Sequence, residues 1–128
     1  MSGNLKLINA EPEFWEFIRK LRTDRRVMHG FLTEKYISSE DQKEYMGKYS
    51  DNYFVALYDG SAAGYIGVLD DDIRVCTHPD FQGRGVGTFM LKEIGNRFPR
   101  ASGRIKRSNI SSQKAFNKAG VFYRIIDG

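Results

Sequence analysis

The segment that most constrains the fold is a run of three glycines between a strand-like and a helix-like stretch. It reads Gln82-Gly83-Arg84-Gly85-Val86-Gly87-Thr88, and we call it the glycine loop. Before it, the alternation of Ile73, Val75 and Thr77 indicates a strand, which Pro79 ends because proline donates no backbone hydrogen bond. After it, apolar residues recur at helical spacing and stop before a proline: Val86, Met90, Leu91, Ile94 and Phe98.

A glycine loop that opens a helix is a suitable place for a phosphate group. Backbone N–H groups and the positive end of the helix dipole converge there, and glycine lets the backbone approach the anion closely. Two familiar phosphate motifs do not fit. The loop lacks the Gly-Lys-Ser/Thr ending of a P-loop, and Thr88 stands where the dinucleotide fingerprint requires its third glycine.

The rest of the chain predicts strands and helices in a single domain that spans residues 1–128. Ser39 and Gln42 predict a capping box at the start of a helix, with Tyr45, Met46 and Tyr49 on its core face. We expect strands at 4–9, 53–58, 62–69, 103–107 and 121–126, helices at 11–23, 40–49 and 112–119, a short helix and loop at 24–38, and a hairpin turn at Asp59-Gly60. This order predicts one mixed sheet with helices on its faces, an α+β or α/β class.

Composition narrows the class further. The 128 residues, 41% of them hydrophobic, suffice for one core, and no stretch is apolar enough for a membrane span or a signal peptide, so we expect a cytoplasmic protein. One cysteine and two histidines predict neither a disulfide nor a structural metal site. Twenty Lys and Arg against sixteen Asp and Glu give a formal charge of +4, which favours an anionic ligand.

Together with the preceding His78-Pro79-Asp80-Phe81, the glycine loop resembles the acetyl-CoA signature of the GNAT superfamily of N-acetyltransferases, whose core pattern is Gln/Arg-x-x-Gly-x-Gly/Ala. A second segment, Asn109 to Val121, resembles the family's Asn-x-x-Ser/Ala-x-x-x-Tyr-x-Lys-x-Gly-Phe. The resemblance extends from Tyr53 to Phe122. It implies a three-layer fold with a mixed, mostly antiparallel sheet of about six strands, flanked by about four helices.

The resemblance also implies acetyl-CoA as co-substrate and gives roles to particular residues. Backbone N–H groups on the strand before the loop, at Val75 and Thr77, would pair with the acetyl carbonyl and the pantetheine amides. Asn109 and Ser112 would line the thiol end. The CoA pyrophosphate would be bound by backbone amides of Gln82, Gly83, Arg84, Gly85, Val86, Gly87 and Thr88.

Members of the family are expected to use direct attack of a neutral amine on the thioester, with the Val75 N–H stabilising the oxyanion. No covalent enzyme intermediate is needed, so Cys76 is interpreted as a small buried hydrophobe. Phe116 departs from the family pattern, which often has a tyrosine there to protonate the thiolate. Either Ser112, Tyr123 or an ordered water serves instead, or the thiolate leaves unprotonated.

Candidates for the general base are Glu34 and His29 in the acceptor-side loop and the acidic run Asp70–Asp72, although each residue of these types is more often simply solvated. His78 is interpreted as a structural or surface histidine. The basic residues from Arg100 to Arg107 have no interleaved aromatics for stacking bases, so attraction of the CoA 3′-phosphate explains them better than nucleic acid.

The acceptor predicted from the sequence is the primary amine of a small molecule. The segment Leu21–Val27 resembles the acceptor side of members that modify amino sugars or protein N-termini, and its basic residues suit a nucleotide-linked amino sugar. The alternatives are a protein N-terminal acetyltransferase and an inactive acyl-CoA-binding module, the latter suggested by Phe116 and by the early end at Gly128. That end leaves a sheet edge open or covered by a second subunit, as in a homodimer.

Overall fold

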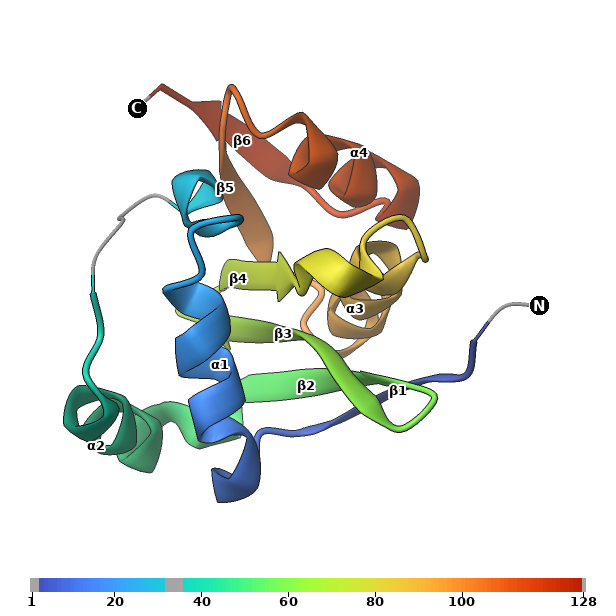
Figure 1. Cartoon of the computed structure of the whole chain (residues 1–128). Helices are drawn as coiled ribbons and strands as arrows, with labels where there is room; N and C mark the ends of the chain where they lie inside the picture. The colour runs from blue at the N-terminus through green and yellow to red at the C-terminus, as the bar shows by residue number, and fades with distance from the viewer. Residues whose placement is uncertain (1–2, 32–35, 128) are drawn as a thin grey trace.

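The computed structural model describes residues 3–31 and 36–127 and contains one six-stranded sheet, in the order β1-β2-β3-β4-β5-β6 (Figure 1). The first four strands pair antiparallel, while β4 with β5 and β5 with β6 pair parallel. The strands are β1 Leu5–Asn9, β2 Tyr53–Tyr58, β3 Ser61–Leu69, β4 Asp72–Thr77, β5 Ser102–Lys106 and β6 Tyr123–Ile126. The predicted mixed, mostly antiparallel sheet is confirmed.

Four α-helices accompany the sheet within the described residues: α1 Trp15–Arg22, α2 Ser39–Tyr49, α3 Val86–Arg97 and α4 Ile110–Ala119. α1 packs with α2 and α3 with α4. Short 3₁₀ turns lie at Pro12–Phe14, Met28–Gly30, Ser50–Asn52 and Pro79–Phe81. The three-layer α+β fold is therefore as predicted, with one helix pair on each face of the sheet.

Two hydrophobic clusters, one on each face of the sheet, hold these layers together. Successive side chains of a strand point to opposite faces, so Phe54 joins the α3 and α4 side while its neighbour Val55 joins the α1 and α2 side. The pairing extends this alternation across the sheet, because Val55 lies opposite Tyr65 and Tyr65 lies opposite Cys76. Cys76 is 8% exposed, which confirms it as a buried residue.

The capping prediction for α2 is wrong by one residue. Ser38, not Ser39, is the N-cap, and its hydroxyl accepts a hydrogen bond from the Asp41 N–H at 3.1 Å. Gln42 is buried and donates to the Trp15 carbonyl at 3.1 Å, so its side chain is engaged by α1 and does not close a capping box. The sequence offers two adjacent serines, and this contact with α1 decides between them.

The prediction that Tyr49 of α2 faces the core is also wrong. Met46 is fully buried and Tyr45 is half-buried, but Tyr49 is 39% exposed. Tyr49 is the last residue of the helix, and its ring packs on that of Tyr45 with centroids 4.8 Å apart. It therefore covers a core residue from the solvent side.

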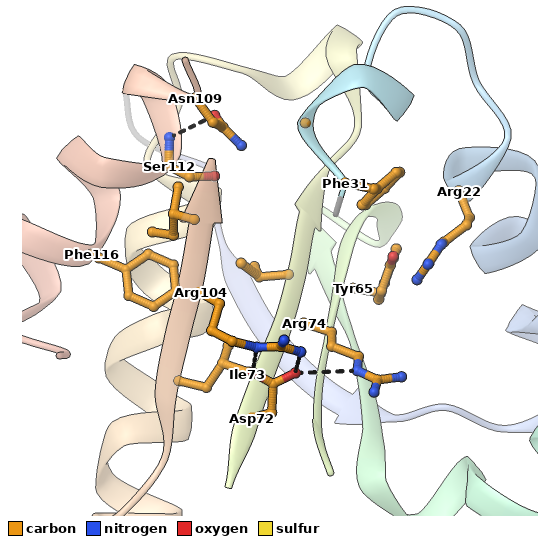
Figure 2. A pocket seen from close by; sticks show the side chains of 13 residues that line it. Arg22, Phe31, Tyr65, Asp72, Ile73, Arg74, Arg104, Asn109, Ser112 and Phe116 are labelled. Atoms are coloured by element: carbon orange, nitrogen blue, oxygen red, sulfur yellow. Dashed lines mark hydrogen bonds and ion pairs between the residues drawn. The ribbon is translucent and has the colours of Figure 1, made fainter. Parts of the chain in front are cut away.

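β4 and β5 are joined at one end only. Their parallel register contains two pairs, Asp72 with Ser102 and Ile73 with Gly103, and ends there. Towards the glycine loop the two strands diverge, as Figure 2 shows. The divergence leaves the facing backbone edge of β4 without a strand partner from Arg74 onwards, and this opening positions the candidate site.

Candidate functional site

The glycine loop is the turn between β4 and α3. Gly83 and Gly85 have positive φ values of 80° and 82°, a backbone conformation that strongly favours glycine. Gly85 is the N-cap of α3, and no side chain caps this helix. The first N–H groups of the twelve-residue helix are therefore left for a ligand, at the positive end of its dipole.

The outer face of the loop is open while its inner face is tightly packed. A Cβ atom added at Gly83 or Gly85 would meet nothing within 4 Å. At Gly87 it would lie 3.3 Å from Thr77 Oγ1 and 3.7 Å from the Ala115 side chain. Gly87 thus lets α3 start close against β4 and α4, so the exposed N–H groups border the opening between β4 and β5.

Backbone donors also face this opening from β4. The His78 N–H donates to the Ala63 carbonyl at 2.7 Å, and hydrogen-bonded pairs alternate along an antiparallel ladder. The backbone N–H of Cys76 is therefore directed towards β3, whereas the N–H groups of Val75 and Thr77 are directed towards β5. Since the pairing with β5 has already ended at Ile73, these two N–H groups line the opening.

A cavity of about 740 Å³, here called the loop cavity, occupies this opening. Its wall combines the glycine loop with β4 and with α4, including Lys114 and Lys118. From the loop it takes Gln82, Gly83, Gly85, Val86, Gly87 and Thr88. Arg84 is absent from the wall because its guanidinium is packed over the rings of Tyr58 and Phe81, at 5.4 and 5.6 Å from their centroids.

A second cavity, of about 280 Å³, continues from the loop cavity between β4, β5 and the end of α1 (Figure 2). We call it the arginine cavity because Arg22, Arg74 and Arg104 line it. The two cavities share six wall residues: Gly30, Phe31, Val75, Asn109, Ser112 and Phe116. A ligand in one cavity can therefore contact a ligand in the other beside Val75.

Asn109 and Ser112, for which the resemblance implies a place at the thiol end of CoA, both lie at this shared wall. The Asn109 side chain caps α4 by accepting a hydrogen bond from the Ser112 N–H at 3.2 Å (Figure 2), so the helix begins at Ile110, two residues earlier than predicted. Phe116 is 2% exposed and reaches both cavities. Tyr123 packs edge-on against Phe116 and is not among the residues that line either cavity.

The candidate bases are placed unevenly. His29 belongs to the 3₁₀ turn Met28–Gly30, next to the shared wall residue Gly30, and Glu34 lies outside the described residues. Asp70 and Asp71 are exposed residues of the turn before β4. Asp72 alone of the acidic run lines the arginine cavity, where Arg104 binds it. Among residues 3–31 and 36–127 no three potential metal ligands come together.

Four residues stand out in the wall of the arginine cavity: Arg22, which belongs to the segment Leu21–Val27 predicted on the acceptor side, and Tyr65, Arg74 and Arg104, which were not predicted there. They come from α1, β3, β4 and β5, so no local motif links them. Tyr65 lies within a strongly apolar strand and reads as a core residue, and it is indeed 1% exposed. Tyr65 nevertheless lines the cavity, and its buried hydroxyl has no hydrogen-bond partner among the described residues.

Burial affects the acidity of two groups at the site. It raises the pKa of the Cys76 thiol to about 12, so the thiol stays protonated and is a poor nucleophile. Burial also raises the pKa of Tyr65 above its ordinary value, more than the nearby Arg22 lowers it. The Tyr65 hydroxyl is therefore a proton donor in hydrogen bonds across the physiological range.

Comparison with known families decides the class. Residues 49–125, more than half of the chain, match the model of the acetyltransferase (GNAT) domain. The chain belongs to the GNAT acetyltransferase family. The match contains the glycine loop, β4 and the whole of α4, and therefore most of the wall of the loop cavity. A search of curated proteins finds no match to this GNAT domain.

Solved structures share the fold of this GNAT domain at low sequence identity. A spermidine N-acetyltransferase from Vibrio cholerae, in complex with CoA and spermine, superimposes with a TM-score of 0.76 at 16% identity, over 91% of this chain and 79% of that one. A GNAT-family acetyltransferase from Bacillus anthracis gives 0.73 at 16% identity, over 94% and 81%.

A third solved structure is the acetyl transferase from Salmonella typhimurium that modifies the N-terminal serine of the 50S ribosomal protein L7/L12. It gives a TM-score of 0.69 at 15% identity and covers 92% of this chain and 80% of that one. The predicted family and fold are thus confirmed, and the GNAT domain is an N-acetyltransferase. None of the helices in residues 3–31 and 36–127 has the length and apolar character to cross a membrane.

Proposed function

We propose that this GNAT domain transfers an acetyl group from acetyl-CoA to the primary amine of a small molecule. The observation that carries the proposal is the pair of connected cavities that meet at Val75. One cavity has the uncapped start of α3 and the β4 backbone donors in its wall, and the other has room for a separate acceptor. The solved structure from Vibrio cholerae is in complex with both CoA and spermine, which supports a fold that binds CoA and an amine together.

In this proposal acetyl-CoA occupies the loop cavity. Its pyrophosphate would accept hydrogen bonds from the backbone of the glycine loop and the first turn of α3. Lys114 and Lys118 on α4 would attract the 3′-phosphate. The pantetheine amides would pair with β4 at Thr77 as an added strand does, because the β4 edge is unpaired there.

The acetyl carbonyl would then lie at Val75, where the two cavities meet. The acceptor nitrogen forms the new C–N bond, the Val75 N–H stabilises negative charge on the carbonyl oxygen, and the C–S bond breaks to release the CoA thiolate. Ser112, or a water it holds, is our candidate to protonate the thiolate, since Phe116 carries no exchangeable proton and Tyr123 lies behind Phe116. His29 and Glu34 remain the candidates to accept the proton from the amine.

A small acceptor fits the size of the arginine cavity, and an amino sugar remains our preferred example. The Salmonella typhimurium relative keeps protein N-terminal acetylation as the second candidate. An inactive acyl-CoA-binding module would bind acetyl-CoA without turnover.

β6 is an edge strand, so the predicted homodimer would pair or cover this edge. The cytoplasmic location and the absence of a metal stay predictions.

Calorimetric titration with acetyl-CoA tests the cofactor site. Gly85→Asp places a carboxylate on the open face of the glycine loop, where the pyrophosphate would lie. Gly60→Asp is the matched control, because Gly60 also has a positive φ, 86°, and open space around it, but lies in the β2–β3 hairpin. We expect binding by the parent and the control and a loss of at least about tenfold in Gly85→Asp, the effect of one charge-assisted contact.

Turnover is measured as the release of free CoA thiol with a panel of amines. Absence of acetyl-CoA binding by the parent protein, or equal binding by Gly85→Asp, would reject the proposed site. Binding without thiol release on any amine or peptide would establish the inactive module. Thiol release only with peptides would establish the N-terminal acetyltransferase.

A further inference from the structure

The arginine cavity has the wrong charge for a cationic acceptor. Its charged wall residues are three arginines and one carboxylate, Asp72, a formal excess of two positive charges. Such a wall repels a polyamine and attracts an anion, and the effect is stronger in a partly enclosed cavity than at an open surface. The acceptor of this protein should therefore differ in charge from spermine, to which the Vibrio cholerae relative is bound.

The one carboxylate in the wall is already engaged. Arg104 binds Asp72 through two parallel hydrogen bonds of 3.0 Å, from Nε to Oδ1 and from Nη2 to Oδ2. Arg74 Nε lies 3.7 Å from Oδ2 on the other side (Figure 2). A carboxylate held between two guanidinium groups has little capacity left for a substrate ammonium.

Arg22 is held in place without a carboxylate partner among the described residues. Its guanidinium carbon lies 4.8 Å from the centre of the Phe31 ring, which orients the group by a cation–π contact. In Figure 2 the guanidinium points towards Tyr65. A half-buried guanidinium with unused donors in a cavity wall is suited to bind a carboxylate or a phosphate.

The Tyr65 hydroxyl provides an independent sign of a ligand. It is the one buried side-chain polar atom within the described residues that lacks a hydrogen-bond partner, and Tyr65 is 1% exposed. Leaving a buried hydroxyl unpaired is unfavourable, because the group loses its hydrogen bonds to water without replacing them. Tyr65 lines the arginine cavity together with Arg22 and Arg74, so an anion bound beside these residues would offer its hydroxyl an acceptor.

We infer that the acceptor amine carries an anionic group, a carboxylate or a phosphate, that is bound by Arg22, Arg74 and the Tyr65 hydroxyl. This inference rests on the proposed acetyl transfer. The same positive wall disfavours the ammonium form of the amine, which helps to supply the neutral nitrogen that the attack requires. The cavity volume of about 280 Å³ gives room for a small acceptor such as an amino acid or an amino-sugar phosphate.

Binding to the protein saturated with CoA tests the charge preference without requiring turnover. The probes are matched pairs: amino acids beside their carboxamides, and glucosamine 6-phosphate beside glucosamine, with spermidine as the cationic probe. We expect the anionic member of at least one pair to bind about tenfold or more tightly than its neutral partner, the effect of one charge-assisted bond. The pair that shows the preference distinguishes a carboxylate from a phosphate.

Two variants with matched controls assign the preference to the site. Tyr65→Phe should weaken the anionic probe about tenfold without lowering the melting temperature of the ligand-free protein, because its hydroxyl makes no bond to lose. Tyr53→Phe should lower the melting temperature and leave binding of the anionic probe unchanged, because its hydroxyl is hydrogen-bonded to that of Tyr45 at 2.8 Å. Arg22→Gln should weaken the anionic probe by at least about tenfold, whereas Arg25→Gln, outside both cavities, should not.

The inference is overturned if no anionic amine binds, if the neutral probes or spermidine bind as tightly, or if Arg22→Gln leaves the preference intact. These failures are distinct from failure of the proposed function. They leave acetyl-CoA binding at the glycine loop unaffected, whereas the proposed function fails if the parent protein does not bind acetyl-CoA or if Gly85→Asp binds it as tightly as the parent.

Discussion

Exchanging Gly103 for alanine should destabilise the protein, although alanine is normally the better residue. Gly103 is a buried residue of β5, and an added Cβ would lie 2.5 Å from Cε2 and 2.6 Å from Cζ of Phe116. Carbon atoms pack at about 3.5–4.0 Å, so the ring would have to move by roughly 1 Å. It has little room to do so, because Phe116 is 2% exposed and packs against Tyr123.

The magnitude follows from two opposing effects. Overpacking of this kind costs about 1–3 kcal/mol. Replacing glycine also restricts the unfolded chain, which stabilises the fold by about 0.4–1 kcal/mol where the backbone is unstrained. We therefore expect Gly103→Ala to lower the free energy of unfolding by about 1–2 kcal/mol. With a urea m-value of about 2 kcal/mol/M, the midpoint should fall by roughly 0.5–1 M.

Urea unfolding followed by circular dichroism measures this effect, and Gly47→Ala is the control. Gly47 lies in α2 with nothing within 4 Å of an added Cβ, so the same exchange should raise stability by about 0.5–1 kcal/mol. In the double variant Gly103→Ala with Phe116→Leu, the smaller side chain should relieve the clash and the losses should not add. A stable Gly103→Ala protein, or strictly additive losses, would refute this account of the packing.

Three further predictions concern other contacts. Asn109→Ala should lower stability by about 1 kcal/mol, seen in the melting temperature, because α4 loses the cap that accepts the Ser112 N–H; no change would mean that the cap is dispensable. Arg26 lowers the pKa of Asp24 to about 2, so this pair stabilises the fold above about pH 4 and its contribution is lost as the pH falls towards 2. The difference in melting temperature between the parent protein and Asp24→Asn should therefore shrink between pH 4 and pH 2. A difference that stays constant over this interval would contradict the prediction. Cys76 should react with Ellman's reagent at pH 8 only after unfolding in urea, and rapid native reaction would contradict its burial.

Local signals in the sequence were sufficient for most of the fold. The Asp59-Gly60 turn and the alternation before Pro79 fix the strands, since both are properties of neighbouring residues. The errors occur where a local pattern has two equivalent solutions. Ser38 and Ser39 can each cap a helix, and the bond from Gln42 to α1 selects between them only in the folded protein.

The loop cavity and the arginine cavity differ in how far they could be predicted from local sequence patterns. The glycine loop and the segment from Asn109 are continuous motifs, so the loop cavity could be anticipated from the sequence. The arginine cavity could not, because Arg22, Tyr65 and Arg104 are brought together by sheet pairing and by the packing of α1. In the sequence, Arg22 is one of several basic residues in the segment Leu21–Val27 and Tyr65 looks like a core residue, and neither pattern indicates that the two side chains line the same cavity.

With acetyl-CoA in the proposed site, the short junction between β4 and β5 would make the rigidity of the protein depend on this ligand. β5, α4 and β6 are attached to the rest of the sheet by two backbone residue pairs, by the ion pair of Arg104 with Asp72 and by the packing of α4 on α3. Acetyl-CoA in the loop cavity would contact both sides and act as a brace, adding about 2.7 kcal/mol of stability at one hundred times its dissociation constant. Amide hydrogen exchange in β5 and β6 should then slow on binding, and the lifetime of the protein in the cell would rise and fall with its supply of acetyl-CoA.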